Sequence, residues 1–200
     1  MTAGLGLISG DDFVRGLAEL QADAAFGRAL PPVERWEPAN CGEIDLRIAR
    51  DGTWFYLGTP IARPALVRLF STILRREHDG SFCLVTPIEK AKITVEDAPF
   101  LAVSVTISGH SEAMQCTFLT NVGDSVSCGP TNLIRTVTDQ VTGEPRPYVH
   151  VRRGLEARIT RAVFYELVAN AQTRSMAGRN DLGVWSGGIF HILGDDPGNA

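Results

Sequence analysis

The fold of the first half of the chain follows from residues 43–87, which read EIDLRIARDGTWFYLGTPIARPALVRLFSTILRREHDGSFCLVTP. Apolar and polar residues alternate from Ile44 to Ile48, the pattern of a strand that buries one face. Asp51-Gly52 comes next, a dipeptide whose positive φ angles suit a two-residue type I′ turn. Residues 53–57 are again rich in strand formers, so we predict a β-hairpin.

An amphipathic helix is predicted to follow this hairpin. Pro64 is tolerated only in the first turn of a helix, which sets the expected start near Ala62. Apolar residues then recur at three- and four-residue spacing, namely Leu66, Leu69, Phe70, Ile73 and Leu74. His78-Asp79-Gly80 should end the helix, and residues 81–86 should return as a strand.

The composition is that of a folded protein with a mildly acidic surface. Hydrophobic residues make up 44% and charged residues 21% of the 200 residues, which is enough for sizeable cores. The net charge of −4 provides no basic field, so we expect no nucleic-acid partner. No apolar run approaches the roughly 20 residues of a membrane-spanning helix. The N-terminus also lacks a signal-peptide pattern, and we therefore expect a cytoplasmic protein.

The cysteines and histidines give no sign of a metal site. Cys41, Cys83, Cys116 and Cys128 form no C-x-x-C pair, so we expect reduced and mostly buried thiols. The histidines show neither H-x-x-x-H nor H-E-x-x-H spacing. We predict neither a metal nor a cofactor.

The rest of the chain is predicted to be a second set of strands with a helix near its end. A helix is also expected before the first hairpin, over residues 9–24. After Pro87 the predicted strands follow one another with links too short for crossovers, as in an antiparallel meander. They cover residues 89–95, 100–107, 114–120, 125–127, 133–137 and 148–151. A second helix over residues 154–172, a loop over 176–183 and a strand over 188–193 complete the chain.

The two helices of this prediction resemble each other. Residues 61–70, I-x-R-x-x-L-x-x-L-F, align without a gap over residues 159–168, I-x-R-x-x-F-x-x-L-V. We therefore predict an α+β protein with mostly antiparallel sheets, built from two related, duplicated units. The first unit, with the N-terminal helix, covers residues 1–87 and the second covers residues 88–200. The alternative is two unrelated helix–strand units.

Four segments of the sequence resemble the bacterial domain-of-unknown-function family 1285. They are W-E-P-x-x-C-G-E-I-D-L-R-I-A-R-D-G-T-W-F-Y-L-G-T-P-I at residues 36–61, L-V-R-L-F at 66–70, L-V-T-P-I-E-K at 84–90 and V-E-D-A-P-F at 95–100. The resemblance implies two related α+β domains, the second with an outline like a pleckstrin-homology fold, and a ligand site where the domains meet. A nucleotide-derived ligand and a role in signalling have been suggested for the family, for which no activity is established.

The first-turn arginines of the two helices are the candidate ligand-binding groups. Arg63 and Arg161 each share a helix face with apolar residues, so each charge must be paired. One reading is an ion pair with a carboxylate of the chain: Asp45, Asp51, Glu89 or Glu166. The other is an anion site with aromatic rings that stack on a base. The full predicted site is Arg47, Trp54, Tyr56, Arg63, Glu89, Arg161, Tyr165 and Trp185.

The function that we expect is a non-catalytic module that binds a small anionic, nucleotide-like ligand. The sequence is also compatible with a homo-oligomer. One alternative is a serine hydrolase, because residues 109–113, G-H-S-E-A, resemble the G-x-S-x-G elbow around Ser111, with Asp181 and His191 following in order. The missing second glycine and the strand expected over 114–120 speak against it. Another alternative is a scaffold that binds a protein through its strand edges.

Overall fold

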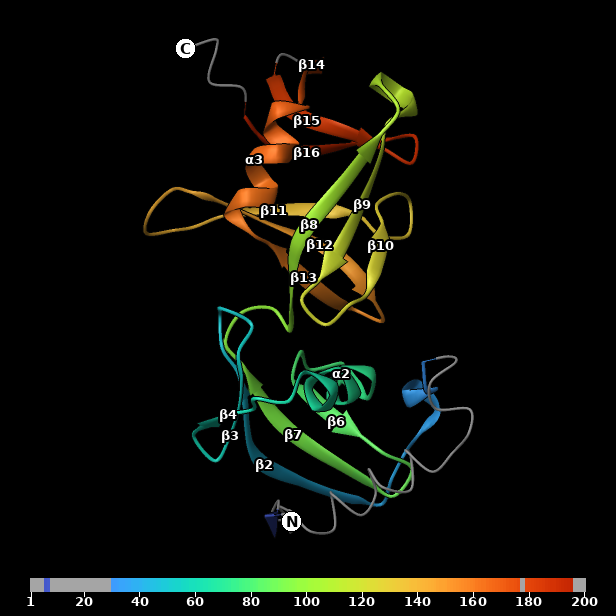
Figure 1. The fold of residues 1–200 in the computed structure, drawn as a ribbon, viewed down its shortest axis with the longest axis vertical. Helices are drawn as coiled ribbons and strands as arrows, with labels where there is room; N and C mark the ends of the chain where they lie inside the picture. The colour runs from blue at the N-terminus through green and yellow to red at the C-terminus, as the bar shows by residue number, and fades with distance from the viewer. Residues whose placement is uncertain (1–5, 8–29, 177–178, 196–200) are drawn as a thin grey trace. The chain divides into compact units, whose positions relative to one another are not determined.

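The computed structural model describes residues 6–7, 30–176 and 179–195 (Figure 1). The chain divides into two compact units, Met1–Asp97 and Ala98–Ala200. The N-terminal helix expected over residues 9–24 lies outside the described residues.

The first unit is built on a seven-stranded sheet with the order β4-β3-β2-β7-β6-β5, beside which β1 pairs with β2. The elements are β1 (Gly6–Leu7), η1 (Val33–Arg35), β2 (Asn40–Ile48), β3 (Trp54–Tyr56), β4 (Thr59–Pro60), α2 (Pro64–Thr72), β5 (Leu74–Arg76), β6 (Phe82–Val85) and β7 (Glu89–Val95). Strand β2 pairs with β7 and with β1 in parallel, and the other neighbours are antiparallel. The sheet is therefore mixed.

The boundary between the units lies later than the expected division between residues 87 and 88. Strand β7 follows that point, yet it pairs with both β2 and β6 of the first unit. Its backbone hydrogen bonds therefore keep it in the first unit, and the division falls between Asp97 and Ala98.

The hairpin between β2 and β3 is confirmed, but its turn differs from the prediction. The N–H of Ala49 donates to the carbonyl of Thr53 at 2.9 Å, and the N–H of Gly52 donates to the carbonyl of Ala49 at 3.0 Å. Of Asp51 and Gly52, only the glycine has a positive φ, at 81°. The loop is a three-residue turn closed by a glycine bulge, because a type I′ turn needs positive φ at both central residues.

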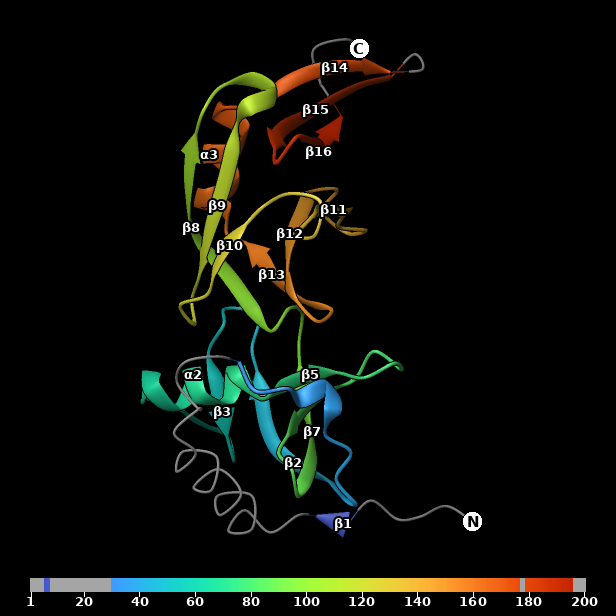
Figure 2. The ribbon, with the colours of Figure 1, turned by 90° about the vertical axis from the view of Figure 1, so that its right-hand side faces the viewer.

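Helix α2 is shorter than predicted. It lies against one face of the sheet (Figure 2), where Phe70 stacks on Trp54 with ring centroids 6.1 Å apart. The helix ends at Thr72, and Leu74–Arg76 forms β5 beside β6. A short run of buried apolar residues fits a helix face and a strand equally well, so the periodicity did not mark this end.

The second unit contains a six-stranded sheet with the order β10-β9-β8-β13-β12-β11 and a separate three-stranded sheet, β14-β15-β16. Its elements are β8 (Phe100–Ser108), η2 (Ser111–Ala113), β9 (Gln115–Thr120), β10 (Ser125–Ser127), β11 (Ile134–Thr138), β12 (Pro145–Arg152), β13 (Leu155–Ile159), α3 (Arg161–Ala169), β14 (Gln172–Met176), β15 (Arg179–Ser186) and β16 (Ile189–Asp195). Strands β8 and β13 pair in parallel, and the other neighbours are antiparallel. Helix α3 packs beside β8 (Figure 2).

The first residues of the predicted second helix form strand β13 instead. Burial alternates along it, with Leu155, Ala157 and Ile159 buried. Arg153-Gly154, with φ angles of 50° and 74°, makes a tight turn of the type I′ kind between β12 and β13. Helix α3 starts only after this strand. The loop expected over residues 176–183 was also wrong, since β14 and β15 pair as a hairpin.

The two units have a repeat-like architecture. Strands β2 to β7 of the first unit occupy the same places in the sheet order as β8 to β13 of the second, with one parallel pair at the centre of each path. Helix α2 follows the third of these strands, whereas α3 follows the sixth. The alignment of residues 61–70 with 159–168 therefore joins helices that are not equivalent. The described residues contain two α-helices, so the expected α+β fold is mostly β.

Gly183 tests the packing of the three-stranded sheet. A Cβ at this position would lie 2.5 Å from the carbonyl oxygen of His191 and 2.7 Å from the ring of Phe190. We expect Gly183→Ala to lower the free energy of unfolding by about 1–3 kcal/mol, the usual cost of overpacking, in chemical denaturation. Gly194→Ala is the control, because a Cβ there meets nothing within 4 Å. Equal losses in the two variants would contradict this reading.

Candidate functional site

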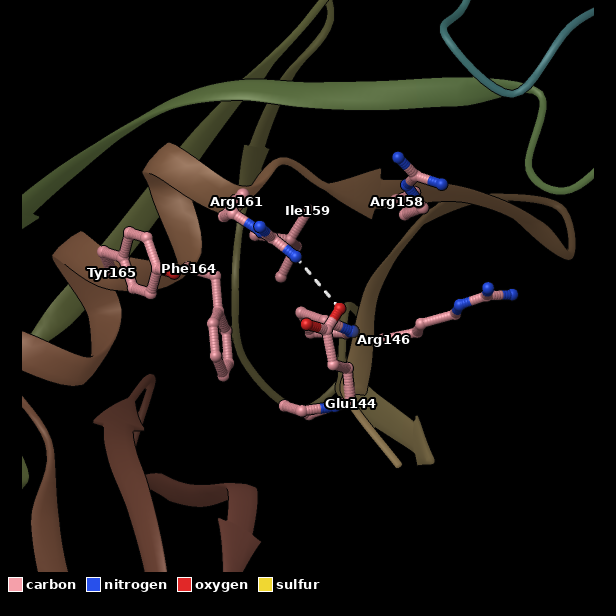
Figure 3. Close-up of a pocket in the computed structure, with 9 residues that line it drawn as sticks. Glu144, Arg146, Arg158, Ile159, Arg161, Phe164 and Tyr165 are labelled. Carbon is pink, nitrogen blue, oxygen red and sulfur yellow. Dashed lines mark hydrogen bonds and ion pairs between the residues drawn. The ribbon is translucent and has the colours of Figure 1, made fainter. Parts of the chain in front are cut away.

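A cavity of about 340 Å³ opens at the start of α3 in the second unit (Figure 3). Strand β12, the residue before it, the end of β13 and the first turns of α3 form its walls. The lining residues are Glu144, Pro145, Arg146, Pro147, Arg158, Ile159, Arg161, Phe164 and Tyr165. Three arginines thus share a cavity with two aromatic rings, a combination that suits an anionic ligand with a flat ring.

Arg161 reaches across the cavity toward Glu144 (Figure 3). Its Nη2 donates to Oε2 of Glu144 at 2.9 Å, and the two side chains are 70% and 60% exposed. An ion pair with this exposure contributes only about 0–1 kcal/mol, because water and salt screen it. Arg146 forms an ion pair with Asp139. The guanidinium groups of Arg146 and Arg158 point away from Phe164 (Figure 3).

Strand register and the helix start position the three arginines. Arg158 of β13 lies opposite Tyr148 of β12, so these two side chains share one face of the sheet. Arg146 lies two residues before Tyr148 on the same strand, and it therefore lies on the same face as Arg158. Arg161 is the first residue of α3, and the N-cap residue Thr160 makes no side-chain capping hydrogen bond. The positive end of the α3 dipole therefore lies at the cavity and adds to the field of the arginines.

The loop that carries Glu144 is tied at its base. Oδ1 of Asp139 accepts the N–H groups of Thr142 and Val141, each at 2.8 Å. These bonds, with that from Thr142 the largest, lower the pKa of Asp139. The N–H of Asp139 donates to the carbonyl of Glu144 at 2.8 Å. The backbone of Glu144 is thus held while its side chain stays exposed.

Two residues of the predicted site, Arg161 and Tyr165, lie in this cavity. Arg161 is exposed and forms an ion pair, but its partner is Glu144 and not Glu166 or another of the carboxylates named as candidates. Trp185 lies elsewhere, edge-on to Phe190 with ring centroids 5.5 Å apart. The ligand-binding roles of Arg161, Tyr165 and Trp185 stay predictions.

The predicted arginines of the first unit have different surroundings. Arg47 pairs with Glu96 and lies 4.3 Å from the centroid of the Phe55 ring. Arg63 is the N-cap residue of α2, with extended backbone angles and an exposed side chain. It precedes the helix rather than lying on its inner face, because Pro64 takes the first helical position.

The other predicted residues of the first unit are mostly internal. Trp54 is 1% exposed and stacks on Phe70, so its ring belongs to the core. Glu89 is buried at the turn between β6 and β7, where its N–H donates to Oγ1 of Thr86 at 3.0 Å. Tyr56 is exposed at the end of β3. Their binding of a ligand stays a prediction.

Seven of the nine lining residues were not among the predicted ligand contacts, and the charged or aromatic ones of these are Glu144, Arg146, Arg158 and Phe164. A usable signal was present in the alternation of apolar residues from Leu155 to Ile159, which was assigned to a helix. If that segment is taken as a strand joined to β12 by a regular turn at Arg153-Gly154, Arg158 falls opposite Val149, and a bulge between His150 and Arg152 moves it opposite Tyr148.

The hydrolase arrangement around Ser111 does not form. Ser111 is exposed in the η2 turn, and strand β9 follows instead of a helix. The candidate base, His191, has its ring nitrogens in other contacts. Nδ1 accepts the N–H of Ile134 at 3.3 Å, and Nε2 lies 3.3 Å from the carbonyl of Ser186.

The contact between Cys128 and His191 does not make a cysteine nucleophile either. The Cys128 sulfur lies 3.4 Å from Nε2 of His191. Burial raises the pKa of the Cys128 thiol to about 12. Since Nδ1 of His191 accepts a hydrogen bond, Nε2 carries the proton and cannot take one from the thiol. The pair is structural and neutral.

Neither a metal centre nor a membrane-spanning helix is found in the part of the chain that the structure describes. No three His, Cys, Asp or Glu residues gather there in a way that could hold a metal ion. No described helix combines the length and the apolarity needed to cross a bilayer.

Two models of one sequence family match the larger part of each unit. Residues 31–98 match the N-terminal domain of a family described as a domain of unknown function, DUF1285, and residues 99–193 match its C-terminal domain. This two-unit, mostly β protein belongs to the DUF1285 family, as the resemblance implied. No curated protein matches the chain.

Two solved structures of DUF1285 family proteins are similar to this chain. A protein from Silicibacter pomeroyi DSS-3 is 50% identical, with 90% of this chain and 94% of that chain covered and a TM-score of 0.80. A protein from Shewanella baltica OS155 is 26% identical, with 62% of this chain and 91% of that chain covered and a TM-score of 0.48.

The buried His191 makes the stability of the second unit depend on pH. Burial lowers the pKa of His191 below its ordinary value of 6.5. The unfolded chain therefore takes up this proton at a higher pH than the native protein does. The free energy of unfolding must fall as the pH drops below about 6.5, until the native pKa is reached.

We expect His191→Gln to lose less stability than the wild type between about pH 7 and pH 5, because glutamine does not titrate. Urea denaturation at each pH measures the difference. His78→Gln, at an exposed position, should keep the wild-type dependence. If His191→Gln followed the wild-type curve, this assignment would be wrong.

Proposed function

We propose that this protein is a non-catalytic cytoplasmic module that binds a small anionic, nucleotide-like ligand in the cavity at the start of α3. The observation that carries the proposal is the gathering of three arginines and two aromatic rings around one cavity. Guanidinium groups form strong, directed hydrogen bonds with phosphate and carboxylate oxygens. An aromatic ring offers a base a face on which to stack.

The electrostatics of the cavity favour an anion. The lining contains Arg146, Arg158 and Arg161 and one carboxylate, Glu144, and Arg146 also forms an ion pair with Asp139 beside the cavity. The start of α3 adds a partial positive charge without any side-chain cap to satisfy it. A phosphate near Arg161 would place an attached ring beside Tyr165, one helical turn further along α3.

Other parts of the proposal follow from the family resemblance. They are a pleckstrin-homology-like outline of the second unit and a role in signalling. The order of six strands followed by α3 supports the outline. Free cysteines in the described residues support a reducing, cytoplasmic location.

Thermal shift measurements with inorganic phosphate, AMP and ATP test the proposal. A bound ligand at 100 times its dissociation constant stabilises the native state by about 2.7 kcal/mol. We expect Arg161→Ala and Arg158→Ala to abolish most of this gain. Without ligand, Arg161→Ala should change the free energy of unfolding by less than about 1 kcal/mol, because its ion pair is exposed.

Arg50→Ala is the matched control, because it removes the same charge from an exposed position in the first unit. It should keep the wild-type response. Arg63→Ala separately tests whether the first unit takes part in binding. A response that survives in Arg161→Ala and Arg158→Ala, or Ser111-dependent labelling by a fluorophosphonate, would contradict the proposal.

A further inference from the structure

We propose that Glu144 is a built-in competitor for the ligand, whose carboxylate occupies Arg161 until an incoming anion displaces it. This inference rests on the proposed function and adds a regulatory element to the same site. Glu144 is the acidic residue of the cavity lining, and its carboxylate holds the guanidinium that reaches furthest toward the middle of the cavity (Figure 3). A carboxylate there occupies a position that a ligand oxygen would take.

The contact between Glu144 and Arg161 has the geometry of an exchangeable pair. One hydrogen bond of 2.9 Å, from Nη2 to Oε2, joins the two side chains. In the same unit, Arg135 holds Glu156 with two bonds of 2.6 Å each, from Nε and from Nη2. The pair of Arg135 with Glu156 is thus bidentate, whereas the guanidinium of Arg161 donates a single hydrogen bond to Glu144. A phosphate can engage both sides of the fork and replace the weaker partner.

The local backbone allows Glu144 to leave without any movement of the loop. Asp139 holds the loop through three hydrogen bonds. Its carboxylate accepts the N–H groups of Val141 and Thr142, and its own N–H donates to the carbonyl of Glu144. The Glu144 side chain is 60% exposed, so rotation about its own bonds carries the carboxylate into water. The exchange is therefore a side-chain movement, fast compared with ligand binding.

The charge on Glu144 also acts against a bound anion. If its carboxylate stayed near Arg161 beside a phosphate, two like charges would share one guanidinium, which disfavours binding. Removing the charge should therefore strengthen binding of every small anion that uses Arg161. An acidic side chain that merely shaped the cavity would have no such effect.

The experiment is a calorimetric titration of inorganic phosphate and of pyrophosphate into the whole protein. We expect Glu144→Gln to bind about two- to fivefold more tightly than the wild type, the range set by an exposed ion pair. Glu166→Gln is the matched control, because it removes the same charge from an exposed position on α3 outside the cavity lining. Glu144→Asp keeps the charge but shortens its reach, and it should gain part of the same increase.

The outcomes separate this inference from the proposed function. Tighter binding in Glu144→Gln and Glu144→Asp, with Glu166→Gln unchanged, supports a competing carboxylate. If Glu144→Gln binds no more tightly than the wild type, or if Glu166→Gln gains as much, the competitor is ruled out while the anion site stands. If neither the wild type nor Glu144→Gln binds either anion, both ideas are overturned.

Discussion

The parallel pairing at the centre of each sheet, between the first and last of six consecutive strands, is the constraint on which both units depend. In the first unit β2 pairs with β7, and in the second β8 pairs with β13. A parallel pair needs a long connection, and in each unit the intervening strands form that connection and also occupy both edges of the sheet. The helices are not part of this common frame, since α2 follows β4 whereas α3 follows β13.

Much of the strand framework could be predicted from the sequence, and the errors have physical causes. The strands near residues 100–107 and 114–120 follow from their β-formers and from the turns between them. Leu74 and Leu155 were placed in helices because apolar spacing in a short window fits both structures. The parallel pairs could not be foreseen, since alternation within one strand carries no information about which partner lies beside it.

The candidate site was harder to predict, because the cavity depends on strand register. Arg161 and Tyr165 could be picked out from a helix pattern, since both lie on α3. Arg158 and Arg146 come together only through the pairing of β13 with β12. Trp54 was predicted to contact the ligand, but its ring packs in the core against Phe70. An aromatic residue on a short strand fits either role, and its sequence alone does not tell the two apart.

The contacts between the two sheets of the second unit allow the sheets to differ in their stability against local unfolding. The hydroxyl of Ser186 donates to the carbonyl of Cys128 at 2.8 Å and accepts the N–H of Cys116 at 2.9 Å, while His191 binds the N–H of Ile134. Side chains, not ladder hydrogen bonds, thus hold the three-stranded sheet to its neighbour. Such a sheet can open as a cooperative unit of its own while the six-stranded ladder stays intact. Amide protons of β14 to β16 would then exchange with solvent at a lower free energy than those of β8 and β13, and the same opening would bring the sealed Cys128 thiol into contact with water.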